Sequence, residues 1–128
     1  KQIALIEAGK QEPVVRVGNL NSIRTIADVR DAVRGMYLAV KHCAYGEAYN
    51  IGGDTTKSIG EILDYLISLS SRKDDIIIKV DPSLLRKADV NLQIPDVSKF
   101  REATNWKPEI PFETTMYDIL QFWREKVK

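Results

Sequence analysis

Short β-branched runs alternate with amphipathic helical segments along this chain, a pattern that excludes all-helical and all-β architectures. The strongest strand signal is the run Ile-Ile-Ile-Lys-Val at 76–80, which an Asp-Pro pair ends. Further strands are predicted at 13–17, at 23–26 and at 48–51, before Gly52 and Gly53. The prediction is therefore an α/β fold in which short strands mix with helices.

Capping residues and apolar residues at helical spacing indicate the helices. Asp28 can cap a helix that Gly46 is expected to end, with one apolar face made of Val29, Val33, Met36 and Val40. Ser58 and Glu61 have the spacing of a capping box before another helix. Shorter helices are predicted at 3–8 and 97–104, and a final helix carries Met116, Ile119, Leu120, Trp123 and Val127 on one face.

The composition limits the classes of partner. The 128 residues suffice for one compact domain, and 19 Lys and Arg against 18 Asp and Glu leave a net charge of +1. Such a balance provides no large basic field, so neither nucleic acid nor a membrane is an expected partner. The lone Cys43 cannot form an internal disulfide, which fits a reducing compartment, and a cytoplasmic location is expected.

The first residues resemble the end of a longer element. Lys1 is followed by a short helical stretch that Gly9 closes, as if the helix had begun before it. We therefore expect that the chain continues upstream in the parent protein.

The usual catalytic constellations are not predicted here. The sequence contains neither Gly-x-Gly-x-x-Gly nor a phosphate-binding loop ending in Gly-Lys-Ser/Thr. His42 is the single histidine, and neighbouring side chains such as His42 and Cys43 do not face each other on a helix. We interpret Cys43 as a packing residue and the adjacent Asp74 and Asp75 as a solvated turn.

Two arginines are better candidates for binding. Arg24 follows a Gly-Asn turn, and Arg86 follows an Asp-Pro turn, with Asp89 three residues later. The planar guanidinium suits two phosphate oxygens at once, and a carboxylate can accept hydrogen bonds from a ribose diol. From spacing alone, a surface salt bridge remains the alternative for each arginine.

A series of short motifs resembles the carboxy-terminal half of the extended short-chain dehydrogenases/reductases, the NAD-dependent epimerase/dehydratase family. Those after residue 80 look most like the GDP-mannose branch of dehydratases and reductases. The motifs are Gly18-Asn19-Leu20, Arg24, Asp28-Val29-Arg30-Asp31, Glu47-Ala48-Tyr49-Asn50-Ile51-Gly52-Gly53, Arg86-Lys87-Ala88-Asp89-Val90, Asp96-Val97-Ser98-Lys99 and Trp106-Lys107-Pro108.

The resemblance implies a substrate-binding role for the whole chain, residues 1–128. It implies that Arg24 and Arg86 bind the diphosphate of a GDP-hexose or its neighbourhood, and that Asp89 binds ribose hydroxyls. Lys87 and Ala88 belong to the same binding motif. NAD or NADP would be bound by an amino-terminal Rossmann half absent here, which also carries the catalytic Tyr-x-x-x-Lys pair. No catalytic residue is therefore predicted in this chain, and the parent enzyme is expected to be a homo-oligomer.

The resemblance also leaves alternatives. Dehydratases carry an aromatic residue and a histidine after the first arginine, where this chain has Thr25-Ile26-Ala27, so the reductases are favoured over the dehydratases. Two rival functions remain open from the residues: a non-enzymatic interaction module and a sugar-nucleotide sensor that has lost catalysis. By the resemblance, Asp28, Asn50, Asp96 and Trp106 are capping and packing residues.

Overall fold

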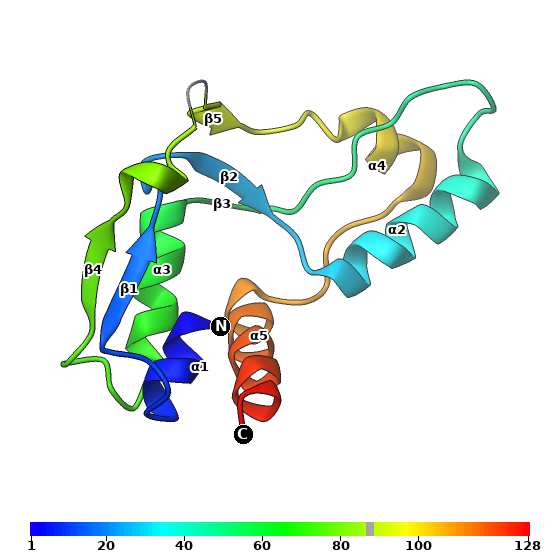
Figure 1. Cartoon of the computed structure of the whole chain (residues 1–128). Helices are drawn as coiled ribbons and strands as arrows, with labels where there is room; N and C mark the ends of the chain where they lie inside the picture. Colours follow the sequence, from blue (N-terminus) through cyan, green and yellow to red (C-terminus); the bar gives the residue numbers. More distant parts are fainter. Residues whose placement is uncertain (87–88) are drawn as a thin grey trace.

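The computed structural model describes residues 1–86 and 89–128. The helical elements are α1 (Gln2–Glu7), α2 (Val29–His42), α3 (Ile59–Ser68), the 3-10 turn η1 (Pro82–Leu84), α4 (Ser98–Thr104) and α5 (Phe112–Lys126). The strands are β1 (Val14–Val17), β2 (Ile23–Ile26), β3 (Thr55–Ser58), β4 (Ile77–Val80) and β5 (Leu92–Gln93). Figure 1 shows an elongated molecule, with α1, α3 and α5 at one end and α2 and α4 at the other.

The strands form two small sheets, which confirms the predicted α/β class. In one sheet β1 and β4 pair in parallel, with Val14 opposite Ile77 and Val17 opposite Val80. In the other, β2 lies between β3, which is antiparallel to it, and β5, which is parallel to it. The chain thus crosses from one sheet to the other between β1 and β2, through the loop at 18–22.

The main core lies where α1, α3 and α5 pack with β1. Its buried side chains are Ile3, Ala4, Ile6, Val15, Leu63 and Leu120. Burial of each large aliphatic side chain contributes about 1.5–3 kcal/mol, so this cluster stabilises that end of the molecule.

A second packing centre joins α2 and α4 at the other end. Phe100 and Trp106 are both buried, with ring centroids 5.7 Å apart. The indole Nε1 of Trp106 donates to the carbonyl oxygen of Asp31 at 3.1 Å. A Cβ on Gly35 would lie 3.2 Å from this Nε1, so the glycine lets α2 approach the ring closely. The packing role predicted for Trp106 is confirmed.

Several caps agree with the sequence, and some boundaries do not. The capping box of Ser58 and Glu61 forms at the start of α3. Asp28 caps α2, but that helix ends at His42, before Gly46. The strand predicted at 48–51 is wrong, because this segment forms no strand in the structure. The polar strand β3 and the two-residue β5 were not predicted.

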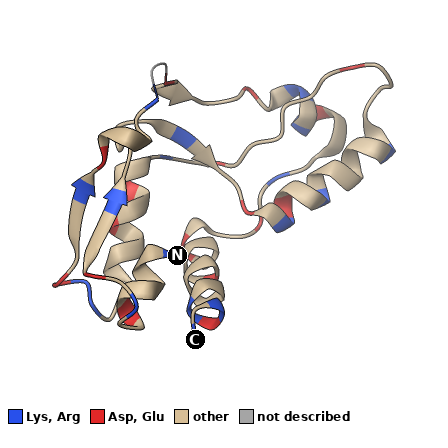
Figure 2. Ribbon diagram, viewed as in Figure 1, with Lys and Arg blue, Asp and Glu red and all other residues tan. Residues whose placement is uncertain are grey.

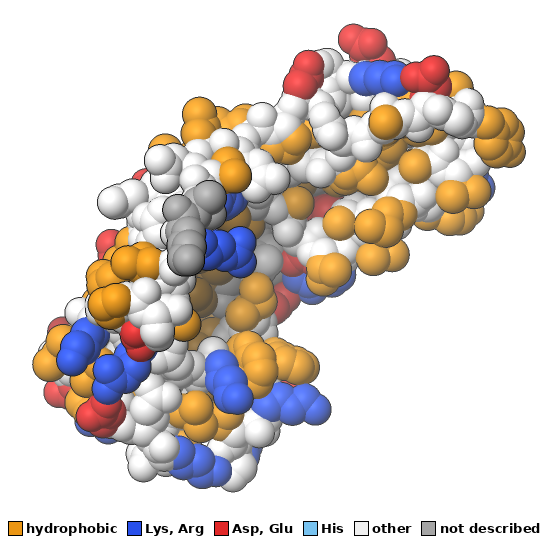
Figure 3. Space-filling view, turned by 45° about the horizontal axis from the view of Figure 1, so that its top comes forward, with side chains coloured by type: hydrophobic (Ala, Val, Ile, Leu, Met, Phe, Trp, Pro, Cys, Tyr) orange, Lys and Arg blue, Asp and Glu red, His pale blue; other side chains and the backbone are white. Residues whose placement is uncertain are grey.

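One face of α2 carries apolar side chains that the described residues leave uncovered. These side chains are between 59% and 81% exposed and comprise Val29, Val33, Met36, Tyr37 and Val40. Ile119 and Phe122 of α5 are also exposed, and with Val29 and Trp123 they line a groove of about 630 Å³. Figure 3 shows hydrophobic side chains gathered on the end of the molecule that contains α2.

No helix in the described part of the chain combines the length and apolar character needed to span a membrane. Lys, Arg, Asp and Glu are distributed over both ends of the molecule (Figure 2). Basic residues occur on β1, β4 and β2, the last of which carries Arg24.

Candidate functional site

The predicted binding residue Asp89 lies at the centre of a polar cluster. Its Oδ2 accepts hydrogen bonds from Asn19 Nδ2 at 2.8 Å and from Ser22 Oγ at 3.2 Å. Arg24 places a guanidinium nitrogen 3.6 Å from Oδ1. The hydrogen bond from Asn19, those from Ser22 and the Val90 backbone, and the charge of Arg24 together hold the pKa of Asp89 below its ordinary value.

The loop at 18–22 is shaped to bring these side chains together. Asn19 Oδ1 accepts from the backbone N–H of Asn21 at 2.9 Å, a local turn typical of asparagine. The carbonyl oxygens of Leu20 and Ser22 accept from the backbone N–H groups of Gly60 and Ile59, both at 2.9 Å. The loop is therefore anchored on the first turn of α3.

The two predicted arginines occupy different settings. Arg24 lies on β2, its side chain is 24% exposed, and its guanidinium also donates to the carbonyl oxygen of Ile23 at 2.8 Å. Arg86 follows η1 and is exposed. The structure thus brings Arg24 and Asp89 together and places Arg86 on the same segment as Asp89. Lys87 and Ala88 lie outside the described residues.

Asn19 and Ser22 contact Asp89 but are not among the predicted site residues. They are separated from Asp89 by 70 and 67 positions, respectively, so local spacing gives no sign of the contact. In the sequence, Asn19 stands out only as part of a turn motif, and Ser22 carries no signal of its own. The extreme burial of Ser22, which is 3% exposed, shows that its hydroxyl faces the interior.

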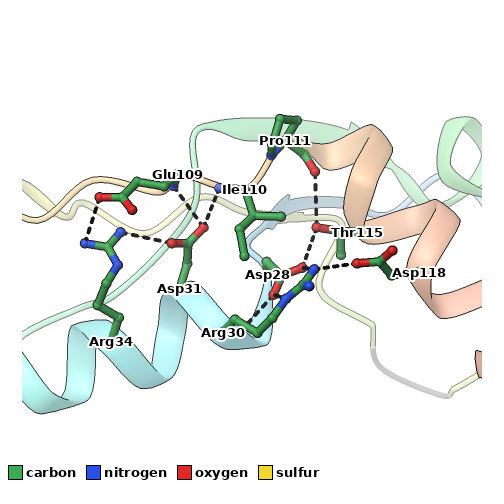
Figure 4. A network of polar contacts seen from close by, with 9 residues as sticks. All are labelled: Asp28, Arg30, Asp31, Arg34, Glu109, Ile110, Pro111, Thr115 and Asp118. Carbon is green, nitrogen blue, oxygen red and sulfur yellow. Dashed lines mark hydrogen bonds and ion pairs between the residues drawn. The ribbon is translucent and has the colours of Figure 1, made fainter.

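A second polar network surrounds Asp28 at the start of α2 (Figure 4). Asp28 accepts from the N–H and Nε of Arg30, both at 2.8 Å, and from Thr115 Oγ1 of α5 at 2.7 Å. Arg30 also donates to Asp118 at 2.8 Å. The Arg30 side chain is the main reason that the pKa of Asp28 lies far below its ordinary range. Asp28 therefore caps α2 and joins it to α5, as its predicted capping role requires.

Asp31, one turn later, is 2% exposed and holds the segment before α5 (Figure 4). Its Oδ2 accepts from the backbone N–H groups of Glu109 and Ile110, both at 2.9 Å, and its Oδ1 from Arg34 at 2.9 Å. Burial alone would raise the pKa of Asp31, but the hydrogen bonds from Ile110, Arg34 and Glu109 outweigh it, so the pKa lies below its ordinary value. Both oxygens are occupied, so this carboxylate serves structure.

The other titratable candidates include His42 and Cys43 at the end of α2. His42 ends α2, and the described residues contain no cluster of three or more His, Cys, Asp or Glu that could hold a metal ion. A Tyr-x-x-x-Lys spacing does occur, at Tyr37 and Lys41 of α2, although no such pair was expected in this chain. Lys41 Nζ lies 4.5 Å from the centroid of the Tyr37 ring, a cation–π contact on the exposed side of the helix.

The described residues do not fit a dinucleotide cofactor. A dinucleotide site needs a glycine-rich turn between a strand and a helix whose N-terminus receives the pyrophosphate. Here β1 continues into another strand, β2, and the described junctions between β2 and α2, β3 and α3, and β5 and α4 contain no glycine. The chemistry available at the cluster is thus recognition of an anion and of hydroxyl groups.

The sequence matches a known family over most of its length. The sequence model of GDP-mannose 4,6 dehydratase matches residues 1–119. GDP-6-deoxy-D-mannose reductase from Pseudomonas aeruginosa is 26% identical over 100% of this chain and 41% of its own length. GDP-mannose 4,6-dehydratase from Sinorhizobium fredii is 27% identical over 83% of this chain and 34% of its own length.

Solved structures show the same fold. A structure of RMD from Pseudomonas aeruginosa complexed with NADPH has a TM-score of 0.85 at 26% identity and covers 98% of this chain and 41% of that protein. UDP-glucose 4-epimerase from Thermotoga maritima, with UDP-glucose, has a TM-score of 0.78 at 21% identity, which shows the fold alone. The chain therefore spans about two fifths of the length of these proteins.

Proposed function

Because the chain belongs to the GDP-mannose 4,6-dehydratase family of extended short-chain dehydrogenases/reductases, we propose that it is the nucleotide-sugar-binding region of such an enzyme. The region comprises residues 1–128 and forms the carboxy-terminal part of the protein. Its proposed ligand is GDP-mannose or GDP-4-keto-6-deoxymannose. The observation that carries this proposal is the contact between Arg24 and Asp89, on segments 65 positions apart in the sequence, beside the exposed Arg86.

The geometry suits a nucleoside diphosphate linked to a sugar. Asp89 Oδ2 is engaged by two neutral donors, whereas Oδ1 faces the guanidinium of Arg24 at 3.6 Å, longer than a normal hydrogen bond. A diphosphate would draw Arg24 toward its own oxygens, because a bidentate contact with phosphate is stronger. Oδ1 would then be free to accept a ribose hydroxyl, with Arg86 supplying a second positive charge.

The cofactor is proposed to bind outside this chain, because its described residues do not fit a dinucleotide. NAD or NADP would supply the hydride chemistry to the parent enzyme. Arg24, Arg86 and Asp89 would bind the nucleotide end and thereby orient the sugar, so that binding energy remote from the reacting carbon aligns the substrate.

Within the branch, we favour a reductase over a dehydratase. The support is the Thr25-Ile26-Ala27 sequence after the first arginine, together with the match to a reductase along the entire chain. The dehydratases remain the second choice inside the same proposal, since their family model also matches residues 1–119.

Replacing Arg24 with alanine is expected to weaken the binding of GDP-mannose by at least about tenfold, because hydrogen bonds to charged groups contribute roughly 1.5–3 kcal/mol. Isothermal titration calorimetry with GDP-mannose and with UDP-glucose measures this effect and the preference for the guanosine nucleotide. Arg16→Ala is the matched control, since Arg16 lies on β1 in an exposed pair with Glu12. Equal affinity of Arg24→Ala and the wild-type chain would contradict the proposed role of Arg24.

The uncovered face of α2 fits a region that packs against another part of an enzyme. We propose that the cofactor-binding lobe covers Val29, Val33, Met36 and Val40 in the parent protein. The isolated chain would cover the same apolar face by self-association, since large uncovered apolar patches favour association.

Self-association has a clear signature in sedimentation equilibrium. We expect the wild-type chain to sediment above its monomer mass of 14.5 kDa at high concentration, and Val33→Glu to shift it toward that mass. Val33 is 59% exposed, so the substitution should not disturb the core. Lys73→Glu, in the turn between α3 and β4, changes the charge without touching α2 and should leave association unchanged. A wild-type chain that stays monomeric at high concentration would refute this part of the proposal.

A further inference from the structure

The described residues 84–86 and 89–93, here called the strap, include Arg86 and Asp89 and contact the loop at 18–23. A Cβ on Gly18 would lie 2.9 Å from the carbonyl oxygen of Leu84, so the backbones meet closely at the start of the strap. The N–H of Ile23 donates to the carbonyl oxygen of Asn91 at 2.7 Å near its end. Between these two points, side chains of the described residues make further hydrogen bonds.

Asn19 is the centre of that middle contact. Its Nδ2 donates to Asp89 Oδ2 at 2.8 Å and to Ser22 Oγ at 3.0 Å, while Ser22 Oγ donates to the same Oδ2 at 3.2 Å. The orientation of the amide follows from its other end, where Oδ1 accepts from the N–H of Asn21. Asn19 and Ser22 are thus fixed donors that converge on one oxygen of Asp89.

We propose that Asn19 and Ser22 are positioning residues of the nucleotide-sugar site. They hold Asp89 beside the strand that carries Arg24. The inference rests on the proposed function for the nature of the ligand, but the hold on Asp89 can be tested without any ligand.

The neutral donors matter because they supply hydrogen bonds to Asp89 without using the positive charge of Arg24. If neutral donors did not engage Oδ2, the carboxylate would take its hydrogen bonds from Arg24, the nearest cation in the described structure, 3.6 Å from Oδ1. An arginine committed to that pair would be less available to a diphosphate. Fixing the strap in advance also lowers the ordering cost that ligand binding would otherwise incur.

The ligand-free test compares Asn19→Ala with Asn21→Ala in the complete chain. Asn21 is the matched control, because its backbone N–H contacts Asn19 and its exposed side chain does not contact Asp89. Carbon-detected NMR titration of the carboxyl groups should show the pKa of Asp89 rising toward its ordinary value in Asn19→Ala and unchanged in Asn21→Ala. Hydrogen exchange at the Ile23 amide should accelerate about tenfold in Asn19→Ala, the loss expected for one hydrogen bond to a charged group. An unchanged titration of Asp89 would overturn the inference.

The ligand arm uses calorimetry with GDP-mannose. Asn19→Ala should bind about tenfold more weakly than wild type, and Asn19→Asp should lose affinity at neutral pH and regain it as the pH is lowered. At neutral pH the introduced carboxylate at position 19 would repel the carboxylate of Asp89. At lower pH, one proton shared between them would restore a hydrogen-bond donor toward Asp89. This pH profile therefore reports the positioning of Asp89. Identical affinities of Asn19→Asp and Asn19→Ala at every pH would overturn it. If the wild-type chain gives no heat, the proposed function fails for this chain, and the ligand-free titration still decides the role of Asn19.

Discussion

The variant Gly53→Ala is expected not to form the native fold at 25 °C, because residue 53 has no room for a side chain. A Cβ there would lie 1.7 Å from the carbonyl oxygen of Ile26 and 3.1 Å from the Cα of Ala27. Both contacts are with backbone, so no side-chain rotation can relieve them. Separating the segments would pull β2 and the cap of α2 away from the chain at 52–53, at a cost that we place at no less than about 3 kcal/mol.

The control for this effect is Gly60→Ala in the first turn of α3. Its Cβ would lie 3.4 Å from the nearest atom, an ordinary contact, and alanine favours helix over glycine by about 1 kcal/mol. Urea denaturation followed by circular dichroism should show a stable Gly60→Ala and a Gly53→Ala without a cooperative transition. Equal stability of the two variants would show that the close approach at Gly53 does not exist in solution.

Acid is expected to weaken the end of the molecule that contains the main core, through Glu7 of α1. Glu7 accepts from Arg124 Nε and a terminal nitrogen of the same guanidinium, both at 2.7 Å, and from Ser70 Oγ at 2.8 Å. The Arg124 hydrogen bonds are the largest cause that lowers the pKa of Glu7 from 4.5 to about 2. The pair therefore joins α1, α5 and the end of α3.

The direction of the pH effect follows from this lowered pKa. Because the folded chain holds the Glu7 proton less tightly than the unfolded chain, the stabilisation is complete above pH 4.5 and is lost as the pH falls to about 2. At 1.36 kcal/mol per pH unit, the loss amounts to about 3 kcal/mol, to which other paired carboxylates such as Asp28 add. Glu7→Gln should lose a similar free energy at pH 7 and show a weaker dependence on acid.

Denaturation by urea at several pH values measures both effects. Glu12→Gln is the control, because the pair of Glu12 with Arg16 is exposed and such pairs contribute about 0–1 kcal/mol. A Glu7→Gln variant that is as stable as Glu12→Gln at pH 7 would contradict the stabilising role of Glu7.

Local signals predicted most of the helices and the hydrophobic strands. The capping box of Ser58 and Glu61 and the β-branched run before Asp81 appear in the structure where their chemistry places them. The strand predicted at 48–51 is absent because a short run of strand-forming residues does not show whether a neighbouring strand is present. Strand β3, with its polar Thr-Thr-Lys-Ser sequence, gave the opposite error: its pairing with β2 comes from tertiary context.

Some residues of the candidate site could be predicted from the sequence, and others could not. Arg24, Arg86 and Asp89 were found through a resemblance in motif order, and residue chemistry alone left a surface salt bridge open for each arginine. Asn19 and Ser22 could not be found, because a hydrogen bond across about 70 positions leaves no periodic trace in one sequence. The burial of Asp31 could not be predicted either, because an acidic residue inside a helix usually faces solvent. Here Asp31 is buried and accepts hydrogen bonds from backbone N–H groups of the segment before α5.

The most direct test of the account is phosphorus NMR of GDP-mannose titrated with the wild-type chain, because it observes the diphosphate itself. If Arg24 and Arg86 bind the diphosphate, both phosphorus resonances will shift or broaden in a saturable manner, and more strongly than those of UDP-glucose at the same concentrations. If both resonances stay unchanged with the chain in excess, the diphosphate does not bind here and the proposed function of this chain is contradicted.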